Sequence, residues 1–180
     1  MRSLAAVIKS KWIFFGLSVI YFVLDVVSKI LVVKYLPIGV TKAVLSPFLL
    51  FIHIKNPGIA YGMFKNPPAG LKTFFFVLII LVMIAASIFL VYLIATSHVK
   101  LRASLISFSL ILGGALGNLA DRIVDREVTD FISIGLTNTL RFNYIFNLAD
   151  MWITFGFSLL IIATFILKED AATKETQRVS

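Results

Sequence analysis

The chain has 180 residues, of which 59% are hydrophobic and only 14% are charged. Soluble domains are usually about 45–50% apolar and about 25% charged, so this composition indicates an integral membrane protein. The net charge of +8 does not indicate nucleic-acid binding, because the basic residues are scattered over loops and termini, where we expect them to meet membrane lipids. The absence of cysteine excludes a disulfide, a thiolate metal site and a cysteine nucleophile.

Four apolar runs are long enough to cross a bilayer, which takes about 20 mostly apolar residues. They lie at about 12–33, 73–95, 103–120 and 151–167. Basic residues precede the first run, as in a secretory signal peptide, but no small-residue cleavage site follows, so we predict a retained helix. The four crossings leave no room for a soluble domain, and the sequence predicts one membrane domain over residues 1–180.

Two loops, at about 34–72 and 121–150, are predicted to lie on the same side of the membrane. Leu45–Ile54 and Leu140–Phe146 are apolar or alternating enough to form strands. The predicted fold is therefore an all-α membrane protein with a small β-sheet at the outer membrane surface. Lys and Arg residues are divided almost evenly between the two sides, so the positive-inside rule does not decide the orientation.

Two aspartates beside the apolar runs carry most of the functional argument. Asp130 lies in a loop in the motif VTDFI, and Asp150 opens the fourth run in the motif FNLAD. An ionised carboxylate at a bilayer centre costs about 2.5–3.5 kcal/mol, so acidic residues at membrane depth are candidate functional sites. Asp130 could instead be a solvated loop residue, and Asp150 a helix-starting acid favoured by the helix dipole. Their apolar and aromatic flanks favour a carboxylate pair that shares a proton.

The first run contains Asp25 and Lys29, which are four residues apart and so share one helix face. They could form a neutralising ion pair at the membrane boundary or contribute to binding of substrate or headgroups. Ser28 and Lys29 do not suit a nucleophile and its base, because adjacent helical residues point about 100° apart.

The motif NPGIAYG after the first predicted strand contains Asn56 and Gly58. Asn, Pro and Gly are turn residues, so the motif could be a simple turn. Its functional interpretation is an amide and exposed backbone groups directed at a peptide.

The third run ends in a mixture of glycines and polar residues. Gly113 and Gly117 predict a small-xxx-small face for close helix packing. Asn118 and Asp121 are three residues apart and share a face. Asp121 and Arg122 could be only a helix stop at the interface, but the density of polar groups favours a cluster near an active site.

Several chemistries are excluded by the residues present. The only histidines are His53 and His98, and no His-Glu-x-x-His zinc motif occurs. The sequence also lacks a phosphate-binding Gly-rich Lys-Ser/Thr loop and the Gly-x-Gly-Asp motif of presenilin-like proteases. We therefore expect no metal and no cofactor.

Five motifs together resemble the lipoprotein signal peptidases, the bacterial type II signal peptidases. The resemblance covers essentially the whole chain and preserves order and spacing. It implies a four-helix aspartyl endopeptidase of the inner membrane, with a periplasmic sheet and active site, both termini in the cytoplasm, and prolipoprotein substrates cleaved just before a diacylglyceryl-modified cysteine. The motifs are DVVSK (25–29), NPGIAYG (56–62), GGALGNLADR (113–122), VTDFI (128–132) and FNLAD (146–150).

By motif position, the resemblance implies that Asp130 and Asp150 are the catalytic pair. Two departures from the family, Tyr61 in place of Phe and Asn143-Tyr144 in place of Trp-Pro, are expected to affect loop packing and substrate fit but not the proposed chemistry. The partners implied are lipidated precursors and membrane lipids, with no nucleic acid, and we expect a monomer. The supporting residues implied are Asp25, Lys29, Asn56, Gly58, Asn118, Asp121, Arg122 and Asn147.

The expected reaction is hydrolysis of one peptide bond by two carboxylates that hold one proton between them. The ionised member would activate water, and the protonated member would stabilise the oxyanion. The sequence does not say which aspartate has which role. Two alternatives remain: a small transporter or assembly subunit whose aspartates form a proton relay, and a membrane protease that needs no lipid on its substrate.

Overall fold

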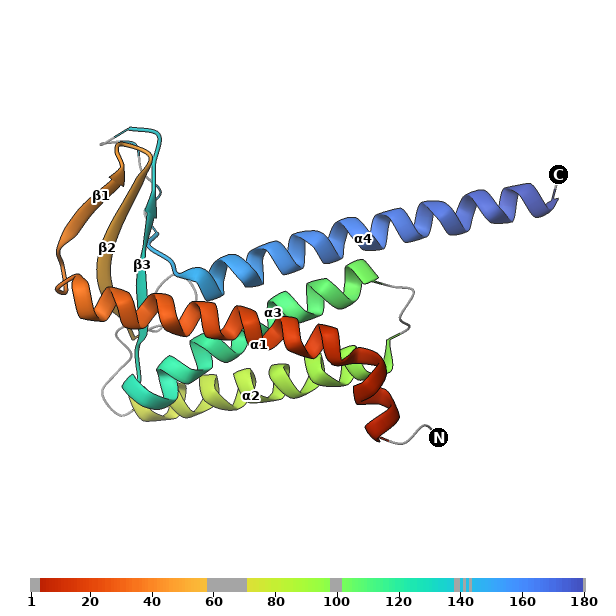
Figure 1. The fold of residues 1–180 in the computed structure, drawn as a ribbon, viewed down its shortest axis with the longest axis horizontal. Coiled ribbons are helices and arrows are strands. Elements are labelled where there is room, and N and C mark those ends of the chain that lie inside the picture. The colour runs from red at the N-terminus through yellow and green to blue at the C-terminus, as the bar shows by residue number, and fades with distance from the viewer. Residues whose placement is uncertain are drawn as a thin grey trace.

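The structure, a computed structural model, describes residues 4–57, 71–97, 102–137, 140, 142 and 144–179. In this part of the chain, four helices are long and apolar enough to cross a membrane, and each predicted run lies within one of them (Figure 1). The four-helix prediction is therefore confirmed. The helices are Leu4–Tyr35 (α1), Lys72–Thr96 (α2), Arg102–Asp125 (α3) and Leu148–Val179 (α4).

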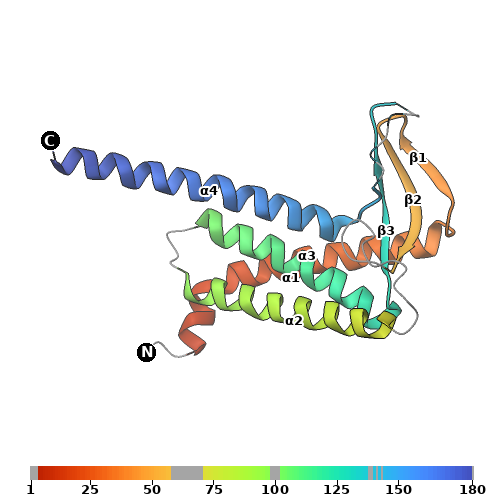
Figure 2. The ribbon, with the colours of Figure 1, turned by 180° about the vertical axis from the view of Figure 1, so that it is seen from behind.

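The helices lie side by side, and a small sheet stands across one end of the bundle (Figures 1 and 2). Helix α1 begins, and α4 ends, at the opposite end of the bundle from the sheet. Helices α1 and α3 end beside the sheet, and α2 and α4 begin there. This arrangement brings the polar end of α3, the first turn of α4 and the sheet to the same level.

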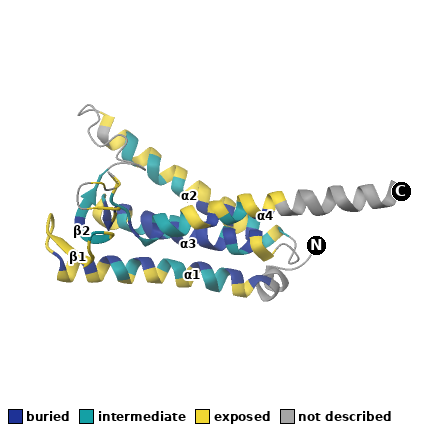
Figure 3. Cartoon of the chain, turned by 90° about the horizontal axis from the view of Figure 1, so that it is seen from above, coloured by how far each residue is buried: buried dark blue, intermediate teal, exposed yellow. Residues whose placement is uncertain are grey.

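Helix α3 is the central helix of the bundle. In the part of α3 that is apolar enough to cross a membrane, 67% of the residues are buried. The corresponding share is at most 22% in each of the other three helices, and their outer faces are apolar and exposed (Figure 3). Gly113 and Gly117 both face α1, where a Cβ at Gly113 would lie 2.8 Å from the carbonyl oxygen of Ser18. The predicted close-packing role of these two glycines is confirmed.

The sheet has three antiparallel strands in the order β1-β2-β3, with bounds Thr41–Leu45, Leu49–Asn56 and Val128–Ile134. Strands β1 and β2 form a hairpin, and β2 pairs with β3 so that Ile54 lies opposite Asp130. The sheet is fixed to the bundle by apolar packing against the end of α1. The buried residues of that contact are Val32, Leu36, Phe131 and Ile132.

Both predicted strands need correction. Residues 45–54 are not one strand, because a turn at 46–48 separates the end of β1 from β2. The predicted strand Leu140–Phe146 is wrong: among its described residues only Phe146 forms a bridge, to Ile132. The third strand is instead Val128–Ile134, whose β-branched and aromatic residues suit a pleated sheet. Asp130, predicted to lie in a loop, is therefore a strand residue.

Candidate active site

Asp130 and Asp150 come together at the sheet-bearing end of the bundle. Asp130 is in the middle of β3 and is only 2% exposed. Helix α4 begins at Leu148, so Asp150 lies in its first turn, and its side chain is partly exposed. The two carboxylates thus approach from a strand and from a helix N-terminus, and one of them retains access to solvent.

Both carboxylate oxygens of Asp130 accept a side-chain amide hydrogen bond. Asn56 Nδ2 on β2 donates to Oδ2 at 2.9 Å, and Asn147 Nδ2 donates to Oδ1 at 2.7 Å. Burial and the nearby charge of Asp150 together raise the pKa of Asp130 to about 6, although the two amides and Lys29 act in the opposite direction. Asp130 is therefore a carboxyl that can retain a proton up to about pH 6.

Asp150 is held by a capping box at the start of α4. Asn147 is the N-cap residue: its Oδ1 accepts a hydrogen bond from the backbone N–H of Asp150 at 3.0 Å. In return Asp150 Oδ2 accepts the backbone N–H of Asn147 at 3.2 Å. Asn147 thus donates to both aspartates, to Asp130 through its side chain and to Asp150 through its backbone. This residue sets their relative position.

Asn118 connects Asp150 to the interior of the bundle. Its Nδ2 donates to Asp150 Oδ1 at 2.8 Å. Its Oδ1 accepts hydrogen bonds from Lys29 Nζ at 3.0 Å and from Asn147 Nδ2 at 3.1 Å. Because Lys29 has only donors, it fixes the orientation of the Asn118 amide and directs the amide nitrogen at Asp150.

Lys29 lies between two carboxylates within the bundle. Its Nζ is 2.7 Å from Asp25 Oδ2 and 3.2 Å from Asp121 Oδ2, and the three side chains are buried or nearly so. Asp25 Oδ1 also accepts the backbone N–H of Ala149, in the first turn of α4, at 2.8 Å. The predicted Asp25–Lys29 ion pair is therefore present, and it also contacts the helix that carries Asp150.

The end of α3 contributes two further supporting residues. Asp121 Oδ2 accepts the backbone N–H of Thr129 at 2.9 Å, which fixes β3 one residue before Asp130. Arg122 is buried, its Nη1 donates to the carbonyl oxygen of Asn118 at 3.2 Å, and its guanidinium interacts electrostatically with both candidate catalytic aspartates. Helix α3 continues to Asp125, so Asp121 and Arg122 are helical and lie beyond the predicted end of the third run.

Gly58 falls outside the described residues. The other predicted site residues gather in one network, and the structure adds two contacts that sequence reasoning missed. Gly117 was interpreted only as a packing residue, but its missing side chain also makes room for the Asp25 carboxylate, which a Cβ would displace. The backbone N–H of Thr129 has no signature in the sequence, because backbone groups depend on register rather than residue type.

Two neighbouring carboxylates, one buried and one partly exposed, are suited to acid–base chemistry on a peptide. A proton retained on one of them lets it donate a hydrogen bond to a carbonyl, while the other accepts a proton from water. The surrounding amides hold both groups without adding charge.

Comparisons with known proteins agree with this chemistry. The family described as Signal peptidase (SPase) II matches residues 17–166. The lipoprotein signal peptidase of Clostridium tetani is 40% identical over 82% of this chain and 88% of its own length, and that of Aeromonas hydrophila is 35% identical over 86% and 88%. A solved bacterial membrane enzyme superposes with a TM-score of 0.70 at 31% identity, covering 89% of this chain and 90% of that one.

Proposed function

The chain belongs to the lipoprotein signal peptidases, the signal peptidase II family, and on this basis we propose that Asp130 and Asp150 are its catalytic pair. It is a multi-pass bacterial membrane protein and an aspartic-type endopeptidase that removes signal peptides from prolipoproteins. Family membership thus decides for a peptidase over a transporter or assembly subunit. The observation that carries the catalytic assignment is that Asn147 donates to both carboxylates.

In the proposed mechanism Asp130 holds the shared proton and Asp150 is the general base. The buried position and raised pKa of Asp130 support the first role. Asp150 is partly exposed, and negative charge is favoured at the N-terminus of α4, which supports the second. Asp150 would take a proton from the attacking water, and Asp130 would hydrogen-bond the scissile carbonyl and stabilise the developing oxyanion.

The remaining residues support the pair in three ways. Asn56 and Asn147 hold Asp130, while Asn118, oriented by Lys29, holds Asp150. Asp25 and Asp121 neutralise Lys29 and fix the backbones next to the pair.

The proposed substrate is a prolipoprotein with a diacylglyceryl-modified cysteine, cleaved just before that cysteine. The test is incubation of the purified protein with a lipidated precursor and with the same precursor lacking the lipid. We expect cleavage of the first only, with the modified cysteine as the new N-terminus by mass analysis. Equal cleavage of both would reject the requirement for lipid.

We also propose that the sheet and the aspartates lie on the outer side of the cytoplasmic membrane. The chain has no cysteine, so Lys42→Cys on β1 and Ser97→Cys after α2 can be labelled singly. An impermeant thiol reagent added to intact spheroplasts is expected to label the first variant and not the second. The opposite pattern would reverse the orientation.

The raised pKa of Asp130 leads to a pH prediction. In the unfolded chain this carboxyl has the ordinary aspartate pKa of 3.8, whereas in the folded protein its pKa is about 6. Between these two pH values the folded state binds more protons than the unfolded chain does. The contribution of this carboxyl to the free energy of unfolding of the wild type therefore falls as the pH rises, by roughly 2–3 kcal/mol in total. The amide of Asp130→Asn does not titrate, so this variant does not lose that contribution. The difference in melting temperature, variant minus wild type, should therefore increase from about pH 4 to about pH 6 and then level off.

Thermal melting of both proteins in one detergent across this range measures the effect. Any hydrogen bond lost or gained by the amide adds a pH-independent offset, so only the slope of the difference matters. A difference that is constant with pH would show that Asp130 does not retain its proton, and the assigned roles would be withdrawn.

A further inference from the structure

The far end of the sheet is formed by two apolar turns that lie against each other. One is the turn between β1 and β2, and the other is the segment that follows β3. They are joined by a hydrogen bond of 3.0 Å from the backbone N–H of Gly135 to the carbonyl oxygen of Phe48. We call this region the sheet tip, and its apolar residues are Leu45, Phe48, Leu136, Leu140 and Phe142.

The apolar side chains of the sheet tip are exposed, and Arg141 is the only charged residue in the two segments that form the tip, 45–48 and 135–142. Phe48 is 51% exposed, and Leu136 and Phe142 are each 66% exposed. No Asp, Glu, Lys or Arg occurs in residues 43–54 or 131–140. A group of large, exposed apolar side chains on neighbouring turns indicates an interaction site.

The position of the tip indicates what covers it. The strands run across the helix axes, and their far ends project past α4, beyond the cross-section of the bundle (Figure 1). Because the helices cross the membrane, strands perpendicular to them lie along the membrane surface. The tip therefore overhangs the lipid that surrounds α4 rather than another part of the described chain.

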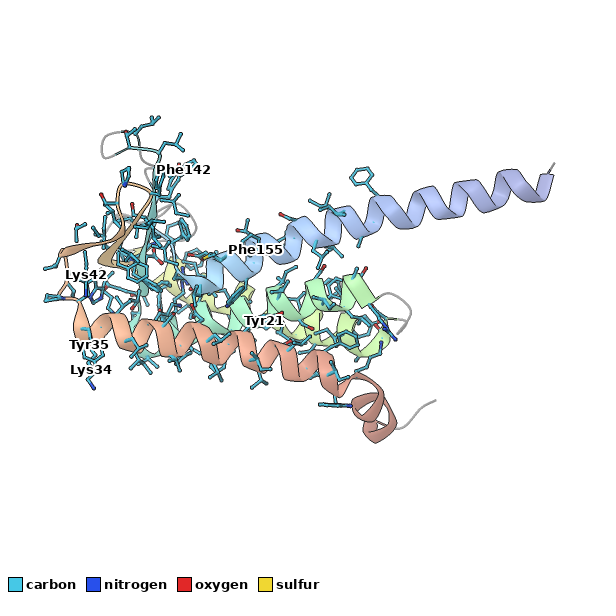
Figure 4. All side chains as sticks on the ribbon, turned by 45° about the horizontal axis from the view of Figure 1, so that its top comes forward. Tyr21, Lys34, Tyr35, Lys42, Phe142 and Phe155 are labelled. Carbon is cyan, nitrogen blue, oxygen red and sulfur yellow. The ribbon has the colours of Figure 1, made fainter. Side chains whose placement is uncertain are left out.

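The positions of three labelled side chains support this placement. Lys42 lies at the end of the sheet near α1, and Phe142 lies at the far end, on the side of the molecule to which Phe155 of α4 also points (Figure 4). Phe155 is 52% exposed on a membrane-spanning helix, so this flank of α4 faces lipid. The tip continues that lipid-facing surface around the end of the helix.

We propose that the sheet tip inserts into the interfacial region of the phospholipid bilayer and anchors the sheet to the membrane. Aromatic side chains are favoured at this depth, and exposed apolar residues gain by partial burial there. The one charged residue of the tip segments, Arg141, is a cation and suits anionic lipid headgroups. The anchor fixes the height of β3, and with it Asp130, above the membrane. The inference goes beyond the proposed function and depends on it only for the activity measurement below.

The first test measures depth by fluorescence in the full-length protein. Trp12 and Trp152 are replaced by Phe, and a single tryptophan is introduced by Phe142→Trp or, as the matched reference on the same sheet, by Lys42→Trp. In nanodiscs, lipids brominated in the upper acyl chain should quench the Phe142→Trp emission more than the Lys42→Trp emission, and aqueous iodide should do the reverse. Equal quenching by iodide in both variants would overturn the anchor.

The second test compares cleavage in two environments. The double substitution Phe48→Asp with Phe142→Asp should lower cleavage of the lipidated precursor in liposomes by roughly fivefold, which corresponds to about 1 kcal/mol, and leave cleavage in detergent within about twofold. An equal loss in both would mean that the tip binds substrate, and no loss in either would mean that it has no role. A change in oligomeric state on light scattering would assign the tip to a second copy.

Each of these last three outcomes overturns the anchor. Failure of the wild-type protein to cleave in detergent would instead reject the proposed function, and the fluorescence result would still stand. The two proposals can therefore fail separately.

Discussion

Replacement of either Asp130 or Asp150 by Asn is expected to lower cleavage of a lipidated precursor by about 10³-fold or more. An amide can neither take the proton from water nor share a proton with its neighbour. Asn has nearly the same shape as Asp, so loss of activity would not follow from lost packing. Initial rates on the lipidated precursor, measured in detergent with equal amounts of purified protein, give the comparison.

The matched control is Asp125→Asn, since Asp125 is exposed and pairs only with Lys55 among the described contacts. It should retain nearly full activity. Melting in detergent checks that all three variants fold. Near-normal cleavage by Asp130→Asn or Asp150→Asn, in a preparation that melts like the wild type, would reject the catalytic pair.

Lys29→Met is expected to be the most destabilising single change in the supporting network. The side chains of Lys29 and Asp25 are 4% and 0% exposed, so removal of the cation leaves Asp25 charged and unpaired inside the protein. Breaking a buried pair in this way typically costs about 3–5 kcal/mol. Asn118 also loses the donor that orients its amide toward Asp150, so activity should fall as well.

Lys55→Met is the same substitution at a more exposed pair, in which the side chains of Lys55 and Asp125 are 20% and 46% exposed. Exposed pairs contribute about 0–1 kcal/mol, so this variant should melt close to the wild type. If Lys29→Met fails to fold, Lys29→Met with Asp25→Asn provides the second measurement, because it removes one stranded charge and should regain stability. Similar small effects of Lys29→Met and Lys55→Met would show that the buried network contributes little.

The membrane helices could be predicted from the sequence because their signal is local. Long apolar runs are sufficient to identify them, and the glycines of α3 indicated close packing correctly. The helix ends were less predictable: Asp121 and Arg122 are polar, yet they stay helical because Asp121 is neutralised by Lys29 and bonded to Thr129. Those stabilising contacts come from distant parts of the chain, so no local pattern reveals them.

The sheet was harder to predict for the same reason. Asp130 interrupts an otherwise strand-like run, and acids are unfavourable in strands, so Val128–Ile134 resembled a loop. Asn56 and Asn147 compensate by hydrogen-bonding the carboxylate from outside β3. The residues of the site were identified by resemblance to a family, whereas the way in which they hold one another required the tertiary structure.

Asn147 has a further consequence, because the residue that starts α4 is also the residue that aligns the two carboxylates. Opening of the first helical turn breaks the capping box and removes the hydrogen bond of Asn147 to each aspartate in the same event. Local opening of a helix end requires less free energy than global unfolding. Activity therefore depends on whether this one helical turn is formed. Gradual heating should inactivate the enzyme below its melting temperature, reversibly and with the rest of the fold intact.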